Sequence, residues 1–348
     1  MSDPRAQGIA CLAGIAPWKR KRLAAMLCNA HPPIFANTAT RAVKAARARG
    51  GAIACWASRV PAGLEAQAVE AGVPIWWIED GFVRSAGLGA ALVPPCSLTL
   101  DSRRPYYDAS GPSDLEVMLQ TRDFTAAEIA RADALLARLR EAAVTKYNLA
   151  GPLPDLPPGR RVVLVIGQVE DDRSVLLGGM GLSMAELLAR ARAEEPDAFL
   201  IYKPHPDVVA GLRSGALAAP EADLVLPHAD LPRLLDRVDI VHTLTSLAGF
   251  EALVRGRQVV VHGAPFYAGW GLTRDHAAPA RRTRRRTLAE LAAAALIAYP
   301  LYADPVTGRP CTPEQLVEAL ARTGPRISRA SIAARLAAWH VGRRARER

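Results

Sequence analysis

Four polar stretches of this 348-residue chain hold residue types that catalysis and anion binding need, and each follows a short apolar run. They span residues 79–84, 168–174, 203–207 and 243–246. The apolar runs predict buried strands, and their alternation with amphipathic helices predicts parallel sheets. Ligands of such sheets bind beyond the carboxyl ends of the strands. We therefore expect these stretches to carry the function.

The stretch DIVHTLTSLAGFEAL, residues 239–253, predicts a strand, a tight turn and a helix. A helix N-terminus offers N–H groups and a positive dipole end, so Thr245 and Ser246 are candidates for a phosphate site. Gly249 allows a group to approach the first turn closely. Glu251 does not have capping-box spacing from Ser246, and we expect it to accept hydrogen bonds from a ribose diol. The alternative is an ordinary N-cap.

The stretch at residues 79–84, EDGFVR, begins with two carboxylates. Glu79 and Asp80 can perform acid/base chemistry, and Gly81 permits a sharp turn beside them. Arg84 can bind a carboxylate through two hydrogen bonds. A turn with a surface ion pair is the alternative.

Two further stretches follow predicted strands of the second half. Residues 168–174, QVEDDRS, hold three adjacent acids, of which we expect one to be exposed, one paired and one in a site. Clustered carboxylates also suit Mg²⁺, and an acidic surface turn is a third interpretation. In the string YKPHPD, prolines on both sides restrict the backbone around His205, and Lys203 lies beside it at the strand end.

Composition narrows the class of protein. No apolar run approaches the ~20 residues that span a bilayer, and we identify no signal peptide. The five cysteines lack metal-ligand or redox spacing, which indicates a reducing cytosol. The formal charge of +10 suits nucleic acid, an anionic membrane or an anionic substrate, but no interleaved aromatic and basic residues favour nucleic acid. The arginine cluster at residues 281–286 is either a solvated loop or a contact for lipid headgroups or a phosphorylated acceptor.

The order of predicted elements divides the chain into two α/β halves. We predict an N-terminal α/β domain over residues 1–150 and a proline-rich linker over 151–159. A C-terminal α/β domain follows over 160–325, and then a basic helix over 326–348. Two Rossmann-like halves facing a cleft are the layout of a GT-B-like glycosyltransferase. A Rossmann oxidoreductase is disfavoured because no GxGxxG follows the first strand, and no P-loop is present.

Several strings, in order along residues 18–316, resemble the KpsC family of capsular polysaccharide biosynthesis proteins. They are EDGFVRSAGLG, PPCSLTLD, YYDASGPSDLE, GQVEDDRS, YKPHPDV, TSLAGFEAL and PFYAGWGLT. The resemblance implies a retaining β-Kdo glycosyltransferase that builds a short Kdo linker on a phosphatidylglycerol-type lipid. KpsC itself carries two such modules in tandem, whereas this chain is long enough for one.

The same resemblance implies the partners of the protein. CMP-Kdo is the donor substrate, and neither a cofactor nor a metal is expected, because cations and N–H donors can hold the CMP phosphate. A lipid-linked acceptor implies a peripheral location on the cytoplasmic face of the inner membrane and a place in a capsule assembly or export complex. No nucleic acid is expected.

The resemblance also implies a role for individual residues in the matching strings. Asp172 looks like the nucleophile that forms a covalent Kdo adduct, with Asp171 as the fallback. Glu79, in the frame E-x-G-x-x-R, is implied to be the acid/base for the acceptor, and Arg84 to meet a carboxylate such as that of Kdo. The other expected substrate-binding residues are Asp80, Gly81, Gln168, Ser174, Lys203, His205, Thr245, Ser246, Gly249 and Glu251.

Two other functions stay open. The first is a different CMP-sugar transferase, such as a sialyltransferase, which would also hold the CMP phosphate with a histidine beside a proline. A non-catalytic capsule assembly or export factor that kept the fold would not need Asp172.

Overall fold

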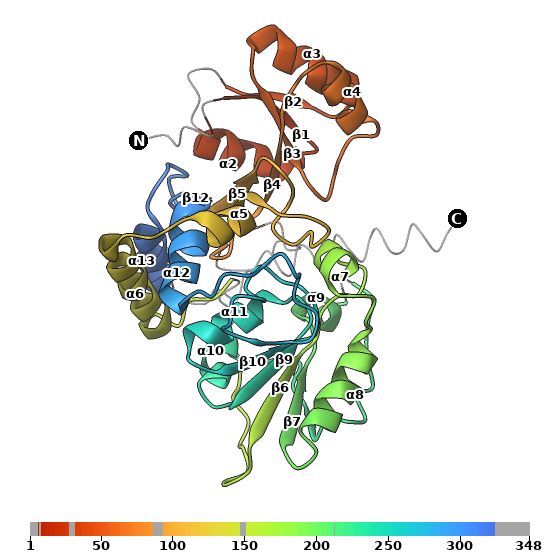
Figure 1. Ribbon diagram of the computed structural model, residues 1–348, viewed down its shortest axis with the longest axis vertical. Coiled ribbons are helices and arrows are strands. Elements are labelled where there is room, and N and C mark those ends of the chain that lie inside the picture. Colours follow the sequence, from red (N-terminus) through yellow and green to blue (C-terminus); the bar gives the residue numbers. More distant parts are fainter. Residues whose placement is uncertain are drawn as a thin grey trace. The chain divides into compact units, whose positions relative to one another are not determined.

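The computed structural model describes residues 6, 8–27, 32–85, 93–146, 151–211 and 213–323. The predicted C-terminal helix over residues 326–348 lies outside these ranges. The chain forms two units, each built on its own six-stranded sheet (Figure 1). The first unit contains the chain up to Ser85 together with Pro94–Arg138 and Ala289–Arg322. The second unit consists mainly of Leu139–Leu288.

The sheet of the first unit has the strand order β12-β5-β4-β3-β1-β2. Strands β1 to β4 run parallel, β5 pairs antiparallel with β4, and β12 pairs antiparallel with β5. The bounds are β1 (Ile9–Ala13), β2 (Ile34–Ala36), β3 (Ala52–Trp56), β4 (Ile75–Asp80), β5 (Ser97–Asp101) and β12 (Pro300–Tyr302).

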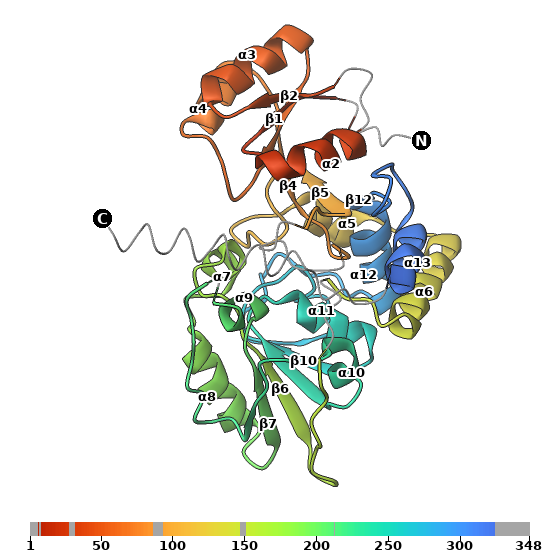
Figure 2. The same cartoon turned by 180° about the vertical axis from the view of Figure 1, so that it is seen from behind.

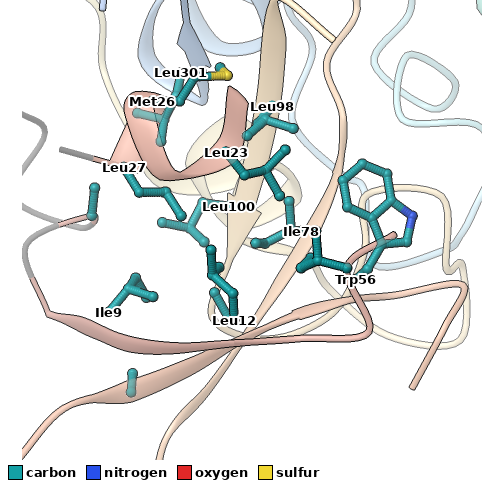
Figure 3. Packing of buried hydrophobic residues seen from close by; sticks show 14 of the residues in the cluster. Ile9, Leu12, Leu23, Met26, Leu27, Trp56, Ile78, Leu98, Leu100 and Leu301 are labelled. Carbon is teal, nitrogen blue, oxygen red and sulfur yellow. The ribbon is translucent and has the colours of Figure 1, made fainter. Parts of the chain in front are cut away.

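Helices cover this sheet because its strands are apolar on both faces. The face toward α2 (Pro17–Leu27) forms a core with the alternate strand residues Leu12, Ala54 and Ile78. Figure 3 shows this core, in which Leu23, Met26 and Leu27 of α2 gather with Ile78, Leu98 and Leu100. The other face packs against α3 (Ala39–Arg49) and α4 (Leu64–Glu70). The remaining helices of this unit that precede the linker are α5 (Asp114–Thr121) and α6 (Ala126–Glu141).

The sheet of the second unit is parallel throughout and has the order β11-β10-β9-β6-β7-β8. Its bounds are β6 (Val162–Ile166), β7 (Phe199–Lys203), β8 (Leu224–Val225), β9 (Ile240–Thr243), β10 (Gln258–Val261) and β11 (Arg274–Asp275). From β6 the chain proceeds outward through β7 and β8, and it then returns to the other side of β6 with β9. The strand order therefore reverses between β6 and β9, which is where such sheets bind ligands.

The helices of the second unit flank these strands. They are α7 (Arg173–Gly178), α8 (Met184–Glu194), α9 (Pro206–Val209), α10 (Leu231–Leu235) and α11 (Leu247–Val254). Ser183 begins α8 with a capping box to Glu186, and Leu187, Leu188 and Ala191 bury its apolar stripe. Figure 2 shows α8 and α10 on opposite sides of the strands.

The predicted α/β fold with two Rossmann-like halves is confirmed, but the chain returns to the first unit after the second sheet. After the second sheet, it forms α12 (Leu288–Ala292), the π-helix η2 (Ala293–Ala298), β12 and α13 (Pro313–Thr323). We predicted one domain over residues 160–325, whereas the pairing of β12 with β5 places the end of that range in the first unit. No helix in the described part of the chain is long and apolar enough to cross a membrane.

Candidate active site

The side chain of Gln168 joins the two loops at the reversal point of the second sheet. Its Oε1 accepts a hydrogen bond of 2.9 Å from the backbone N–H of Thr245, and its Nε2 donates to Thr245 Oγ1 at 2.9 Å. Gln168 follows β6 and Thr245 follows β9, and these strands are neighbours in the sheet. The structure therefore brings together two predicted residues that are 77 positions apart.

Asp172 is the N-cap of α7, and Ser174 connects it to Thr245. Its Oδ1 accepts from the backbone N–H of Ser174 at 2.9 Å and from Ser174 Oγ at 2.8 Å. The Ser174 hydroxyl also lies 3.4 Å from Thr245 Oγ1. The Asp172 side chain is exposed to solvent. The groups that orient its carboxylate are the neutral N–H and hydroxyl donors of Ser174.

The two acids before Asp172 have partners of a different kind. Asp171 is exposed and forms an ion pair with Arg213 at 2.6 Å. The Glu170 carboxylate accepts from the backbone N–H of Met184 at 2.7 Å, which is the start of α8. We expected one exposed, one paired and one site acid, whereas all three residues are exposed and each carboxylate has a partner of its own.

His205 lies at the end of β7 and caps the short helix α9, where its Nδ1 accepts from the backbone N–H of Asp207 at 3.1 Å. Burial, with a smaller contribution from the charge of Lys146, lowers the pKa of His205 to about 4, although the Asp172 carboxylate opposes this shift. The imidazole is therefore neutral near pH 7 and carries its proton on Nε2. It can donate one hydrogen bond to a phosphate but supplies no charge.

Glu251 and Lys203 share a buried electrostatic environment with Lys146. Burial raises the pKa of Glu251 to about 7, although its carboxylate accepts a 2.8 Å hydrogen bond from the backbone N–H of Lys146. Burial lowers the pKa of Lys203, and the Glu251 carboxylate raises it again. Lys146 was not among the predicted site residues, and it lies beyond the end of α6 at Glu141.

The start of α11 is the N-cap that the sequence predicts. Ser246 Oγ accepts from the backbone N–H of Ala248 at 3.2 Å, and Thr243 Oγ1 accepts from the N–H of Ser246 at 3.2 Å. The group that approaches Gly249 closely belongs to the protein itself. A Cβ at Gly249 would lie 2.2 Å from the hydroxyl oxygen of Tyr267, which donates to the Ser246 carbonyl at 2.5 Å. The space that we assigned to a substrate is thus filled by Tyr267.

In the first unit, Glu79 and Asp80 are the last two residues of β4 and not part of a turn beyond it. The Asp80 carboxylate binds Arg84 Nε at 2.6 Å, and Arg84 is completely buried. The carboxylate that Arg84 meets is therefore the one four residues before it. Gly81 is required for a packing reason, since its Cβ would lie 2.3 Å from Ser97 Oγ.

The arginine cluster at residues 281–286 is only partly a solvated loop. Arg282 is buried and donates to the backbone carbonyls of Pro265 and Ala268, and Arg286 is also buried. Arg282 holds the aromatic loop that carries Tyr267, so part of the positive charge serves the fold.

Among the described residues, one group of three could bring ligand atoms to a metal. Glu194, His262 and His276 have ligand atoms within 4.8 Å of one another. The two imidazole rings stack almost parallel with centroids 4.5 Å apart, whereas a shared ion must lie near both ring planes. Arg274 also pairs with Glu194. This geometry fits a stacked, ion-paired cluster better than a metal site.

Comparison with solved structures defines the class of protein. The chain is similar to the structure of Thermosulfurimonas dismutans KpsC, beta Kdo 2,4 transferase, with 32% identity and a TM-score of 0.79. The similarity covers 90% of this chain and 98% of that chain. Together with two mostly parallel sheets, it defines an α/β two-domain glycosyltransferase fold.

Sequence comparison gives the family. The capsule polysaccharide biosynthesis protein family model matches residues 51–153 and 152–303, and the chain belongs to this family. It is 39% identical to the lipopolysaccharide-processing protein LpsZ of Rhizobium meliloti, over 90% of this chain and 74% of LpsZ. It is 43% identical to the capsule polysaccharide modification protein LipA of Neisseria meningitidis serogroup A, over 72% of this chain and 36% of LipA. The chain thus spans about a third of the length of LipA. The resemblance that the sequence strings indicate is confirmed.

Proposed function

We propose that this protein transfers Kdo from CMP-Kdo to a lipid-linked, Kdo-bearing acceptor with retention of configuration. The proposal rests on a chain of side-chain hydrogen bonds at the reversal point of the second sheet, which runs from Gln168 through Thr245 and Ser174 to Asp172. These bonds hold one exposed carboxylate in a fixed orientation where sheets of this kind bind ligands. Family membership supports a role in capsule polysaccharide biosynthesis, and the similarity to a KpsC β-Kdo transferase supports Kdo as the transferred sugar.

Retention requires two inversions at the anomeric carbon. In the first, the Asp172 carboxylate forms a bond to this carbon, and the bond to the phosphate oxygen of CMP breaks, so that CMP leaves with the electron pair. In the second, the acceptor hydroxyl attacks the same carbon and its proton passes to Glu79. The bond to Asp172 then breaks, which restores its carboxylate. Asp171 does not suit this role equally well because Arg213 already neutralises it.

The residues around Asp172 account for the binding of CMP. Lys203 supplies a positive charge, and the Nε2–H group of His205 supplies a neutral donor for the phosphate. The N-terminus of α11, at Thr245 and Ser246, adds N–H donors and a favourable dipole. The Glu251 carboxylate accepts from the ribose diol. Because these groups balance the phosphate charge, the reaction needs neither a metal nor a cofactor.

The proposed acceptor sets the location. A phosphatidylglycerol-type lipid carrying Kdo lies in the inner membrane, so the enzyme works peripherally at the cytoplasmic face and within a capsule assembly or export complex. Exposed arginines of the basic chain suit this anionic surface.

The test is transfer from CMP-Kdo, generated in place because it is labile, to a synthetic Kdo-terminated lipid, followed by mass spectrometry. We expect wild type to add Kdo and Asp172→Ala to add none, while the adjacent Asp171→Ala keeps most of the activity. Intact-protein mass spectra of wild type without acceptor should show one Kdo residue bound to Asp172. Equal activity in Asp172→Ala and wild type would refute the covalent scheme.

The alternatives predict other results of the same assay. A sialyltransferase-like enzyme would prefer another CMP-sugar in donor competition. An assembly or export factor would bind no CMP and show no transfer, and its contribution to capsule export would survive the Asp172→Ala substitution.

A further inference from the structure

The hydrogen bonds that run from Gln168 to Asp172 have a direction, and the geometry determines it. A backbone N–H group can only donate, so the atom of the Gln168 amide that lies 2.9 Å from the Thr245 nitrogen is the oxygen Oε1. The amide nitrogen Nε2 is then the atom 2.9 Å from Thr245 Oγ1, and it donates to this hydroxyl. Gln168 is only 8% exposed. Its amide therefore serves the protein on both sides.

At the other end of this hydrogen-bond chain, the Ser174 hydroxyl has one proton and a strong acceptor for it. Asp172 Oδ1 lies 2.8 Å from Ser174 Oγ, and an ionised carboxylate can only accept, so Ser174 donates. Thr245 Oγ1 lies 3.4 Å from Ser174 Oγ. Because Ser174 has no second hydroxyl proton, Thr245 is the donor of this longer contact. Both hydroxyl groups thus donate toward Asp172.

The two carboxylate oxygens of Asp172 are not equivalent. Oδ1 accepts from the backbone N–H of Ser174 at 2.9 Å and from its hydroxyl at 2.8 Å. Oδ2 has neither a hydrogen bond nor an ion pair with any residue in the part of the chain that the structure describes. Asp172 is exposed, and its charge acts on His205, the proposed donor to the phosphate. The oxygen that can meet a substrate is therefore Oδ2.

We propose that the directed hydrogen-bond chain makes Oδ2 the atom of Asp172 that bonds to Kdo, and that Gln168 and Ser174 are positioning residues for this carboxylate. The inference rests on the proposed transferase function. It gives Gln168 and Ser174, which we expected to bind substrate, a role at the carboxylate instead. In the covalent adduct, Oδ2 is the ester oxygen, and Oδ1 is the carbonyl oxygen that Ser174 still binds.

The two steps of the reaction use these hydrogen bonds differently. Before the first step the carboxylate is fully charged, so donors to Oδ1 stabilise the starting state and do not accelerate the attack. In the second step the acceptor oxygen bonds to the anomeric carbon, its proton passes to Glu79, and the electron pair of the bond to Oδ2 returns to the carboxylate.

Negative charge thus develops on Oδ1 only as Asp172 departs. Hydrogen bonds to a charged acceptor are about twice as strong as those to a neutral one. The donors of Ser174 therefore stabilise the second transition state more than the adduct, as an oxyanion hole does. We infer that the hydrogen-bond chain, which begins at Gln168, accelerates the release of Kdo from Asp172.

The first test follows the adduct by intact-protein mass spectrometry, with CMP-Kdo alone and then with acceptor. Ser174→Ala removes the hydroxyl donor and keeps the backbone N–H that Asp172 caps. We expect the second step to slow about tenfold, because a hydrogen bond to a charged group is lost. The adduct should form from CMP-Kdo at a rate close to that of wild type and accumulate in the presence of acceptor. Equal slowing of both steps, without accumulation, would overturn the proposal.

The second test concerns the remote end of the hydrogen-bond chain. Gln168→Met removes the donor to Thr245, and we expect release to slow about threefold, with adduct accumulation and unchanged CMP affinity. The control Gln258→Met makes the same substitution at an exposed residue that begins β10, at the opposite end of the strands, and should behave as wild type.

The double variant Ser174→Ala/Gln168→Met shows whether Gln168 acts through Ser174. It should be no slower than Ser174→Ala alone, because the hydrogen-bond chain is already interrupted. Multiplied losses, or a CMP affinity that falls together with turnover in Gln168→Met, would assign Gln168 to substrate binding and overturn the proposal.

Crystal structures provide a readout that separates this inference from the proposed function. The wild-type adduct, trapped without acceptor, should show the anomeric carbon bonded to Oδ2 and Oδ1 still bound by Ser174, and a bond through Oδ1 would refute the oxygen assignment. If no Kdo is bound or transferred, the transferase proposal fails. The structure of Gln168→Met then tests the positioning alone. Thr245 Oγ1 should move away from Ser174 Oγ, and an unchanged contact would show that Gln168 does not position Thr245.

Discussion

Each unit has a carboxylate near the end of a strand, but the two carboxylates have partners of opposite kinds, charged in one unit and neutral in the other. In the first unit, Asp80 is paired with the buried cations Lys19 and Arg84. In the second, Asp172 is exposed and is oriented by the N–H and hydroxyl groups of Ser174, which belong to a neutral network. Ion pairing neutralises a carboxylate and fixes the fold. Neutral hydrogen bonds fix the orientation of a carboxylate and leave its charge available for reaction.

The largest expected effect tests the neutral network. Asp172→Asn keeps a good N-cap, because Asn and Asp cap helices about equally well, but it removes the nucleophilic carboxylate. We expect transfer to fall about 10³-fold or more, with the free energy of unfolding nearly unchanged. Activity assays and urea unfolding of the same samples measure both quantities. An active Asp172→Asn enzyme would show that Asp172 serves only as a cap.

The next effect tests the ion-paired cluster. Arg84→Met leaves the Asp80 carboxylate without its closest cation, and we expect it to cost about 3–5 kcal/mol of unfolding free energy. Arg213→Met breaks the exposed pair with Asp171 and should cost at most about 1 kcal/mol. Urea unfolding of both variants provides the comparison. Equal costs would mean that burial does not distinguish the two pairs.

A smaller effect is expected where Tyr267 meets α11 in the second unit. Gly249→Ala places a methyl group 2.2 Å from the Tyr267 hydroxyl oxygen, so we expect a loss of about 1–3 kcal/mol. The second substitution Tyr267→Phe removes that oxygen and should recover part of the loss. Thermal unfolding of the single and double variants tests this, and additive losses would contradict a direct clash.

The smallest effect concerns the titration of Glu251. Because burial raises its pKa to about 7, the folded state favours the protonated form. The stability that this form contributes is complete below the usual glutamate range and is lost as the pH rises through about 7. CMP needs the ionised form to accept from its ribose, so its affinity should rise roughly tenfold from about pH 6 to about pH 8. Calorimetric titrations should show that Glu251→Gln removes this increment, whereas His205, neutral over this range, does not contribute.

Local sequence patterns predicted much of the fold. The apolar runs that lead to the polar stretches at residues 168–174 and 203–207 are β6 and β7, because a buried parallel strand must be apolar on both faces. The cap at Ser246 also follows from local chemistry, since hydroxyls before an apolar helix satisfy its first N–H groups. The alternation of such elements was sufficient to predict two α/β halves.

The candidate site was predictable only in part. Gln168, Asp172 and Thr245 could be named because each follows a strand, and strand order brings their loops together. Arg84 was correctly expected to meet a carboxylate, but the carboxylate is that of Asp80. Gly81, which lies between Asp80 and Arg84, packs so closely against Ser97 of β5 that a Cβ would not fit there.

The sequence by itself determined the elements, the caps, the parallel sheets and the family, because these depend on periodicity and on strings of neighbouring residues. Only the tertiary structure decided that β12 returns to the first sheet, that Tyr267 fills the space at Gly249, and that Lys19 alone among the basic residues of α2 is buried against Asp80. These contacts join segments that are far apart in the chain. Their energies come from packing and from the removal of charges from water, and neither leaves a periodic signal in the sequence.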